Sequence, residues 1–257
     1  MSGMTRRRTS GSVPPVDGPG ILDGSLQPLG WSVGFIEAPM LVVRDALLAW
    51  RRSIGREHVA VDLQDSLPSC ASTLLPLQTP WTRELVVAHG DRWTCYLNNS
   101  LNGGDPVPPV GFLSQSMRIH GVVATCMPRL PVGHAQTKLE YYGPEGQPPL
   151  NYVRAIVAHA QDGRWSWHVT GTPLAFEDTS RYTARRIRDR FDRPTLVTYL
   201  GALGIDVDDA AAYGAATLVE HVVDWPSRTM TLDEARAHYW KERPTRNAPA
   251  RRDETSG

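Results

Sequence analysis

The chain has 257 residues, with 27 basic and 27 acidic side chains that give a net charge of zero, and it contains three cysteines. This balance argues against electrostatic binding of the protein as a whole to nucleic acid or to an acidic membrane, since both ligands are negatively charged and favour proteins with an excess of positive charge. No stretch approaches the roughly 18 consecutive apolar residues of a membrane-spanning helix. Three cysteines without a CxxC pair argue against a disulfide framework and favour reduced thiols, so we expect a cytoplasmic protein without a membrane partner.

Almost every basic residue is an arginine, since lysine occurs only at Lys138 and Lys241. Arginine binds phosphate and carboxylate groups with two parallel hydrogen bonds, so this bias would suit a charged ligand. The bias runs along the whole chain, however, and accompanies 22 glycines and 21 prolines. Codon usage in a GC-rich bacterial genome is therefore the simpler explanation.

Both ends of the chain are predicted to be disordered tails. Residues 1–28 consist largely of Gly, Ser, Pro and Arg, and residues 242–257 have a similar polar composition. Such segments cannot bury enough apolar surface to offset the entropy that ordering costs. Residues 29–241 are then expected to form a single domain, and a subdivision near 171–180 stays open.

The first elements expected in chain order are a strand, a helix and a second strand. Residues 31–36 have the composition of a strand, and Pro39 suits the first turn of a helix. Apolar residues then recur at helical spacing as far as Gly55, which is typical of a helix end. Residues 58–63 predict another strand, so this segment predicts a βαβ-like unit.

Two hairpins are expected next. Residues 84–88 and 93–97 flank a turn at Gly90-Asp91, and residues 152–161 and 164–170 flank Asp162-Gly163. Between the hairpins, residues 119–126 and 137–142 predict two further strands, and residues 109–117 a short helix.

After residue 177 the apolar spacing becomes helical. One helix is expected from Arg181 and another from Pro194 to Gly204, followed by a strand at 216–223 and a last helix at 232–240. The sequence therefore predicts a mixed α+β fold. Its sheet is largely antiparallel, with the βαβ-like unit near the N-terminus and helices near the C-terminus.

His159 and His168 are the first candidate site, and they depend on the register of the second hairpin. If Asp162 and Gly163 form a two-residue turn, Gln161 lies opposite Arg164 and the two histidines become diagonal neighbours on one face. Neighbouring imidazoles can share a proton near neutral pH or bind a metal. No third ligand is apparent in the sequence, so we expect no metal and regard solvated histidines as the simpler interpretation.

The loop at 98–106 is the second candidate, because Asn102, Gly103, Gly104 and Asp105 form its densest turn cluster. Backbone N–H groups in such a loop can bind an anion. The loop lacks the lysine and hydroxyl residues of a P-loop and the spacing of a dinucleotide-binding motif. A connecting loop with Asp105 as a helix cap is the simpler interpretation.

The third candidate is the basic segment 181–193, which contains Arg181, Arg185 and Arg188 among its six arginines. On a helix, Arg185 would meet Asp189 and Arg188 would meet Asp192 one turn later, so a solvated amphipathic helix is the simpler interpretation. A patch for phosphate, nucleic acid or an acidic partner is the alternative. We expect the acidic residues between 206 and 224 either to neutralise it within the fold or to form a separate face.

Trp81 is the last candidate, because it precedes a strand and because Trp and Arg are enriched in protein interfaces. Packing in the core is the simpler interpretation of this tryptophan. The chain contains no catalytic motif for a nucleophile, a metal or a dinucleotide, so we expect no cofactor. The leading hypothesis is a non-enzymatic, immunity-like or accessory protein that acts through a protein–protein interface. The alternatives are an enzyme with a site at the second hairpin and a nucleic-acid binder that uses the 181–193 helix.

Overall fold

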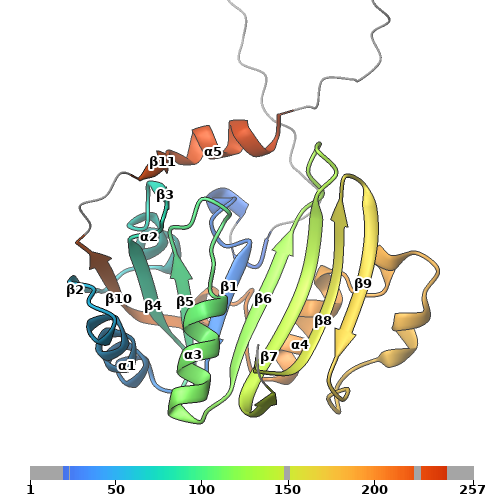
Figure 1. The fold of residues 1–257 in the computed structure, drawn as a ribbon, viewed down its shortest axis with the longest axis horizontal. Helices are drawn as coiled ribbons and strands as arrows, with labels where there is room; N and C mark the ends of the chain where they lie inside the picture. The colour runs from blue at the N-terminus through green and yellow to red at the C-terminus, as the bar shows by residue number, and fades with distance from the viewer. Residues whose placement is uncertain (1–19, 23, 148–150, 223–226, 242–257) are drawn as a thin grey trace, which may run out of the picture.

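The computed structural model describes residues 20–22, 24–147, 151–222 and 227–241. These residues form a nine-stranded antiparallel sheet with helices on both faces, together with a small two-stranded sheet (Figure 1). The order across the large sheet is β2-β10-β4-β5-β1-β6-β7-β8-β9, and β11 pairs with β3 in the small one. The mixed α+β class with a largely antiparallel sheet is therefore confirmed.

The elements have the following bounds. The strands are β1 (Ser32–Ile36), β2 (His58–Leu63), β3 (Leu77–Thr79), β4 (Arg83–His89), β5 (Trp93–Asn98), β6 (Gly121–Met127), β7 (Ala135–Gln147), β8 (Tyr152–Gln161), β9 (Arg164–Thr170), β10 (Tyr213–His221) and β11 (Arg228–Met230). The α-helices are α1 (Met40–Ser53), α2 (Leu67–Ser72), α3 (Val107–Met117), α4 (Arg193–Ala202) and α5 (Leu232–Tyr239). Short 3₁₀ helices are η1 (Gly24–Leu26), η2 (Thr179–Thr183), η3 (Ile187–Asp189) and η4 (Ala210–Ala212).

The βαβ-like unit is present, but its two strands are far apart in the sheet. Each step from β1 through β5, β4 and β10 to β2 is antiparallel, so β1 and β2 run in the same direction. Helix α1 connects them over one face, and three strands lie between them. This arrangement places β2 at one edge of the sheet.

The second hairpin has the register that its turn predicts. Asp162 and Gly163 both have positive φ, at 53° and 78°, which is the backbone that a two-residue hairpin turn requires. Gln161 lies opposite Arg164, and the pairing continues to Ala155 opposite Thr170. His159 therefore lies opposite Ser166, and His168 opposite Val157, on one face of the sheet.

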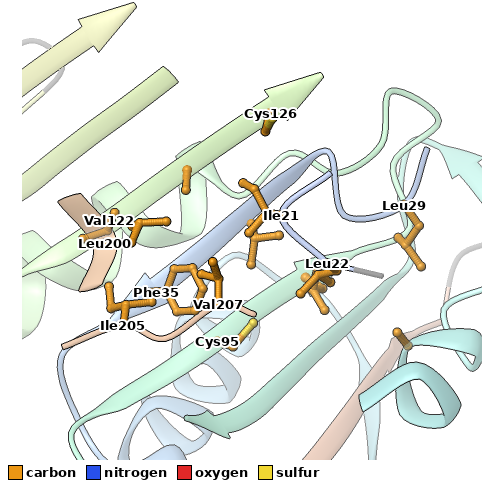
Figure 2. Close-up of a cluster of buried hydrophobic side chains, with 14 of the residues drawn as sticks. Ile21, Leu22, Leu29, Phe35, Cys95, Val122, Cys126, Leu200, Ile205 and Val207 are labelled. Atoms are coloured by element: carbon orange, nitrogen blue, oxygen red, sulfur yellow. The ribbon is translucent and has the colours of Figure 1, made fainter. Parts of the chain in front are cut away.

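Two cores lie on opposite faces of the sheet because alternate residues of each strand point to opposite sides. Helices α1 and α3 cover the face that carries Val86, Tyr96 and Val123. Figure 2 shows part of the other core, where Phe35 and Val122 of the sheet meet Leu200 of α4. Among the described residues, no helix has the length and apolarity needed to span a bilayer.

The helix expected from Arg181 is not formed. Residues 179–189 contain only the two 3₁₀ helices, and the backbone is extended at Ala184 and at Arg186. Tyr182 packs on Trp167 of β9, with ring centroids 5.1 Å apart, and donates a hydrogen bond to Glu177. These contacts with the sheet outweigh the weak preference of the segment for a helix.

The core begins earlier in the chain than composition predicts. Ile21, Leu22 and Leu26 are buried at 2%, 5% and 8% exposure, so the segment from residue 20 belongs to the domain. Figure 2 shows Ile21 and Leu22 among the side chains of the core. The N-terminal tail was expected to extend over residues 1–28; its residues 1–19, and the expected C-terminal tail at 242–257, lie outside the described residues. Three short elements, α2, β3 and β11, were not expected, because segments of three to six residues carry little periodic signal.

Candidate functional site

Trp81 lies beside two arginines, Arg51 and Arg56, near the edge of the sheet that is formed by β2. The guanidinium carbon of Arg51 lies 4.8 Å from the centre of the Trp81 ring and 4.0 Å from that of Trp50. The guanidinium carbon of Arg56 lies 5.2 Å from the Trp81 ring. Cations over indole faces are attracted by the ring quadrupole, so this cluster holds Trp81 in place at the surface.

A buried carboxylate lies beneath this cluster. Arg51 makes a bidentate pair with Glu84, at 2.9 Å from Nε to Oε2 and 2.7 Å from Nη2 to Oε1. The hydroxyl of Tyr96 donates to Glu84 at 2.6 Å, and Nε2 of His221 contacts Oε2 of Glu84. Burial by itself would raise the pKa of Glu84, but the bonds from His221 and Arg51 outweigh it and hold the pKa below its usual value.

This network is suited to holding elements together rather than to chemistry. The side chain of Glu84 is fully buried, and Tyr96, whose pKa is raised well above 10 by burial and by the Glu84 charge, stays protonated as a donor. The network joins α1 to β4, β5 and β10 through side chains whose oxygens are already occupied. It fixes the end of the sheet on which Trp81 lies.

Strand β2, at the edge of the sheet, carries exposed apolar side chains. Its outward side chains Val59 and Val61 are 57% and 49% exposed, and its only strand partner among the described residues is β10. Edge strands in natural proteins commonly carry charges, bulges or a covering segment that prevent pairing with another chain. The central residues 59–61 of β2 carry no charge, and its register with β10 is regular over all six residues.

The free edge of β2 is defined by its hydrogen bonds. The amide of Val222 donates to the carbonyl of Glu57 at 3.1 Å, so the pairs of opposite residues that exchange hydrogen bonds include Val59 and Val61. The amide of His221 instead donates to Thr82 beyond β4, away from β2. By the same alternation, the backbone N–H and C=O groups of His58, Ala60 and Asp62 point away from β10, in the plane of the sheet, and so lie along its free edge.

The second hairpin brings its two histidines together as predicted. The rings of His159 and His168 are nearly parallel with centroids 5.7 Å apart, and the hydroxyl of Ser166 lies 3.0 Å from Nε2 of His159. His159 also lines an open hollow of about 190 Å³ with Met127, His134 and Gln136, among other residues. Among the described residues, no group of three or more His, Cys, Asp or Glu side chains is arranged to hold a metal.

An ion pair that sequence reasoning missed lies on the same face as these histidines. Nζ of Lys138 lies 2.8 Å from Oε2 of Glu140, and the hydroxyl of Tyr152 donates to Oε1 at 3.0 Å. Lys138 is opposite Val157, which is itself opposite His168. The rarity of lysine in this chain was the only signal that pointed to Lys138.

The loop candidate is largely used for packing. The side chain of Asn98 closes the loop, because its Oδ1 accepts from the amides of Ser100 and Asp105. Gly103 has φ +83° and lies against Pro28 and Trp31, and the amide of Gly103 donates to Ser100. Burial raises the pKa of Asp105, and the Lys138 charge and the amide of Val107 offset this only in part. The N-cap residue of α3 is Pro106, without a side-chain hydrogen bond, so Asp105 is not the helix cap that the sequence suggested.

The remaining loop residues, Asn102 and Gly104, also contact neighbouring segments. Oδ1 of Asn102 accepts from the hydroxyl of Tyr239 at 3.2 Å, and Gly104, with φ +108°, lies against the backbone of Ser32. The glycines of the loop are therefore explained by close packing against neighbouring segments.

The arginines of 181–193 are partly paired within the fold. Arg181 contacts Asp192 at 3.0 Å, Arg188 contacts Asp189 at 3.7 Å, and Arg193 contacts Asp208 at 2.5 Å. The pairs expected at one-turn spacing do not form, since there is no helix, and Arg185 is exposed. The Arg193–Asp208 pair joins the basic and acidic segments within the molecule.

Comparison of the chain with family models, with curated proteins and with solved structures finds no match. The site therefore has to be argued from its own geometry. Of the features above, the free edge of β2 was missed by sequence reasoning, because its position depends on pairing with β10, about 155 residues later in the chain.

Proposed function

We propose that this protein works by binding another protein through the free edge of β2. The observation that carries the proposal is the exposure of Val59 and Val61 on an edge strand whose backbone groups at His58, Ala60 and Asp62 point outward. An extended segment of a partner can add to such an edge by main-chain hydrogen bonds, while the side chains of the edge select it.

Trp81 supports the same location. Arg56, which lies over the Trp81 ring, is two residues before the start of β2, and His58 is opposite His221, whose ring centroid lies 5.9 Å from that of Trp81. An incoming strand would therefore meet apolar side chains along β2 and an aromatic–arginine cluster at its beginning. Tryptophan and arginine are the side chains that most often contribute strongly to binding in protein interfaces.

The proposed role is non-enzymatic, of the immunity-like or accessory kind, in the cytoplasm. Cys70, Cys95 and Cys126 are free and buried, which suits a reducing compartment. The buried network that occupies both carboxylate oxygens of Glu84 suits a rigid support for an interface, since pre-organised surfaces lose less entropy on binding.

Selection of peptides on the full chain tests the proposal. A library of extended ten-residue peptides is panned against the wild-type protein, and bound peptides are measured again on Val61→Lys and on Val169→Lys. Val169 is a matched control because it is a 41% exposed valine on β9, the opposite edge of the sheet.

The expected result is a set of peptides with alternating apolar residues that lose at least tenfold in affinity on Val61→Lys and are unchanged on Val169→Lys. Trp81→Ala is expected to weaken the same peptides. Peptides that bind Val61→Lys as well as they bind the wild type would place the interface elsewhere and overturn the proposal.

A second candidate function is favoured by the face that carries His159, His168 and the Lys138–Glu140 pair. These groups, with Asp105 nearby, could bind and transfer protons to a small polar substrate. His159→Ala/His168→Ala should then abolish the binding of that substrate in a screen of small polar metabolites followed by thermal shift. A screen in which wild type and double variant respond identically would remove this candidate.

A further inference from the structure

We infer that the partner of β2 is a second copy of this chain, bound antiparallel along the same edge so that Ala60 lies opposite Ala60 of the second copy. This inference rests on the proposed function of the β2 edge and names its occupant. The pairing would join two nine-stranded sheets into one continuous sheet around a two-fold axis.

The backbone restricts which registers are available. Only His58, Ala60 and Asp62 present outward N–H and C=O groups, so a second copy must pair outward residues with outward residues. This condition allows three registers near the centre of the strand, in which the two-fold axis passes through Val59, Ala60 or Val61. In the intermediate registers, the axis passes between two residues. Each free N–H and C=O group of β2 would then lie opposite a residue whose own backbone groups are bonded to β10.

Charge complementarity selects the register at Ala60. In that register, His58 of each copy lies opposite Asp62 of the other, which makes two polar pairs related by symmetry. The carboxylate of Asp62 is 65% exposed and so remains accessible, although it also accepts from Thr217 at 2.6 Å and lies 3.6 Å from Arg44. With the axis at Val61, Asp62 would instead lie opposite Ala60 and His58 opposite Gln64. With the axis at Val59, Asp62 would lie opposite Arg56, whose guanidinium is already held over the Trp81 ring, and the exposed Val61 would lie opposite the charged Glu57.

The apolar side chains match in the same register. Val59 of each copy lies opposite Val61 of the other on the face of the sheet away from Asp62, so the four exposed valines of the two strands cover one another. On the face that carries Asp62, α1 runs beside β2. Arg44 of this helix lies near Asp62, and Leu41, which is 54% exposed, lies one turn earlier. Because the chain has a net charge of zero, two copies approach without long-range repulsion.

The first experiment measures the mass of the full chain in solution by sedimentation over the concentration range in which it stays soluble. We expect a species of twice 28.4 kDa for the wild type and for Val169→Lys, and a species of 28.4 kDa for Val61→Lys. Circular dichroism confirms that Val61→Lys remains folded. A wild type that stays at 28.4 kDa, or a dimer that Val61→Lys leaves intact, would overturn the inference.

The second experiment determines the register by cross-linking. Val59→Cys, Ala60→Cys and Val61→Cys are oxidised separately, and the three native cysteines add little background because they are buried. Residues that face each other across an antiparallel pair have Cα atoms about 4.5–5.5 Å apart, within the range of a disulfide. We expect an intermolecular disulfide at Ala60→Cys only, and cross-linking at Val59→Cys or Val61→Cys instead would contradict the register.

The two proposals fail in different ways. If the wild type is monomeric but its selected peptides are lost on Val61→Lys, the edge binds a different protein, and only the present inference is wrong. If the wild type is monomeric and Val61→Lys changes no peptide binding, both proposals are wrong. A dimer with the Ala60 cross-link supports both.

Discussion

Arg51 and Glu84 form a bidentate ion pair between α1 and β4 in which the two side chains are only 3% and 0% exposed. An ion pair at this depth is costly to break, because removal of one partner leaves a charge buried without compensation. The pair also lies directly beneath the indole rings of Trp50 and Trp81, so its loss should loosen the end of the sheet that carries the β2 edge.

Arg51→Ala should therefore lower the free energy of unfolding by about 3–5 kcal/mol. Urea denaturation followed by circular dichroism measures this change. Arg52→Ala is the control, since Arg52 is the exposed neighbour in the same helix and its loss should cost no more than about 0.5 kcal/mol. Equal effects of the two substitutions would show that the buried pair contributes no special stability.

The stability of the protein should fall in acid. Burial would raise the pKa of Glu84 and of Glu177, but hydrogen bonds from His221 and Arg51 in the first case, and from Arg154, the Leu174 amide and Tyr182 in the second, lower both. Between the lowered pKa of the folded state and the ordinary value of 4.5, the unfolded chain binds more protons, so stability rises with pH. The contribution is fully present above 4.5 and is lost as the pH falls through the folded pKa.

Urea midpoints at pH 7, 5, 4 and 3 test this expectation. The midpoint should stay level down to about pH 5 and then decrease steeply. A Glu84→Gln/Glu177→Gln variant should be less stable at pH 7 and show a flatter profile between pH 5 and pH 3. A variant whose midpoint falls as steeply as that of the wild type would assign the acid sensitivity to other groups.

Gly103 and Gly201 should respond in opposite directions to substitution by alanine. A Cβ at Gly103 would meet the carbonyl oxygen of Pro28 and lie 3.0 Å from the Trp31 ring, and its φ of +83° is unfavourable for alanine. We expect Gly103→Ala to cost about 2 kcal/mol or more. Gly201 lies within α4 with nothing within 4 Å of a new Cβ, so Gly201→Ala should gain up to about 1 kcal/mol. Thermal unfolding of the two variants measures both changes, and a tolerated Gly103→Ala would mean that the loop does not need its close approach to Pro28.

The three thiols should be unreactive in the folded protein. Burial raises the pKa of Cys126 to about 11 and that of Cys95 further, and it also raises the pKa of Cys70. Only the thiolate reacts with disulfide reagents. At pH 8 we expect no labelling of the native chain by such a reagent and labelling of all three cysteines in denaturant, as counted by mass spectrometry. Rapid native labelling would contradict the burial and would also undermine the cross-linking test of β2.

The elements that depend on local sequence could be predicted. The Asp162-Gly163 turn sets the register of β8 and β9 because a two-residue turn leaves a single pairing for the strands on either side. Pro39 and Gly55 mark the two ends of α1 for similarly local reasons. His159 and His168 therefore lie on one face of the sheet, where the turn predicted them.

The features that depend on distant pairing could not be predicted. Neither the position of β2 at an edge nor the approach of Lys138 to Asp105 follows from residues nearby in the chain. The helix predicted for segment 181–193 is wrong for the opposite reason. The local pattern of the segment is helical, but Tyr182 and Ile187 pack against the sheet instead. In both cases the tertiary contacts decide the structure.

The pairing of β2 with β10 has a consequence for how the chain is made. Strand β2 ends at residue 63, while the strand that holds it ends at residue 221, so during synthesis β2 leaves the ribosome long before its neighbour exists. Both backbone edges of an apolar strand are then exposed together, which is the condition under which nascent chains associate wrongly. Protection of this segment until β10 has been made would therefore favour the yield of folded protein.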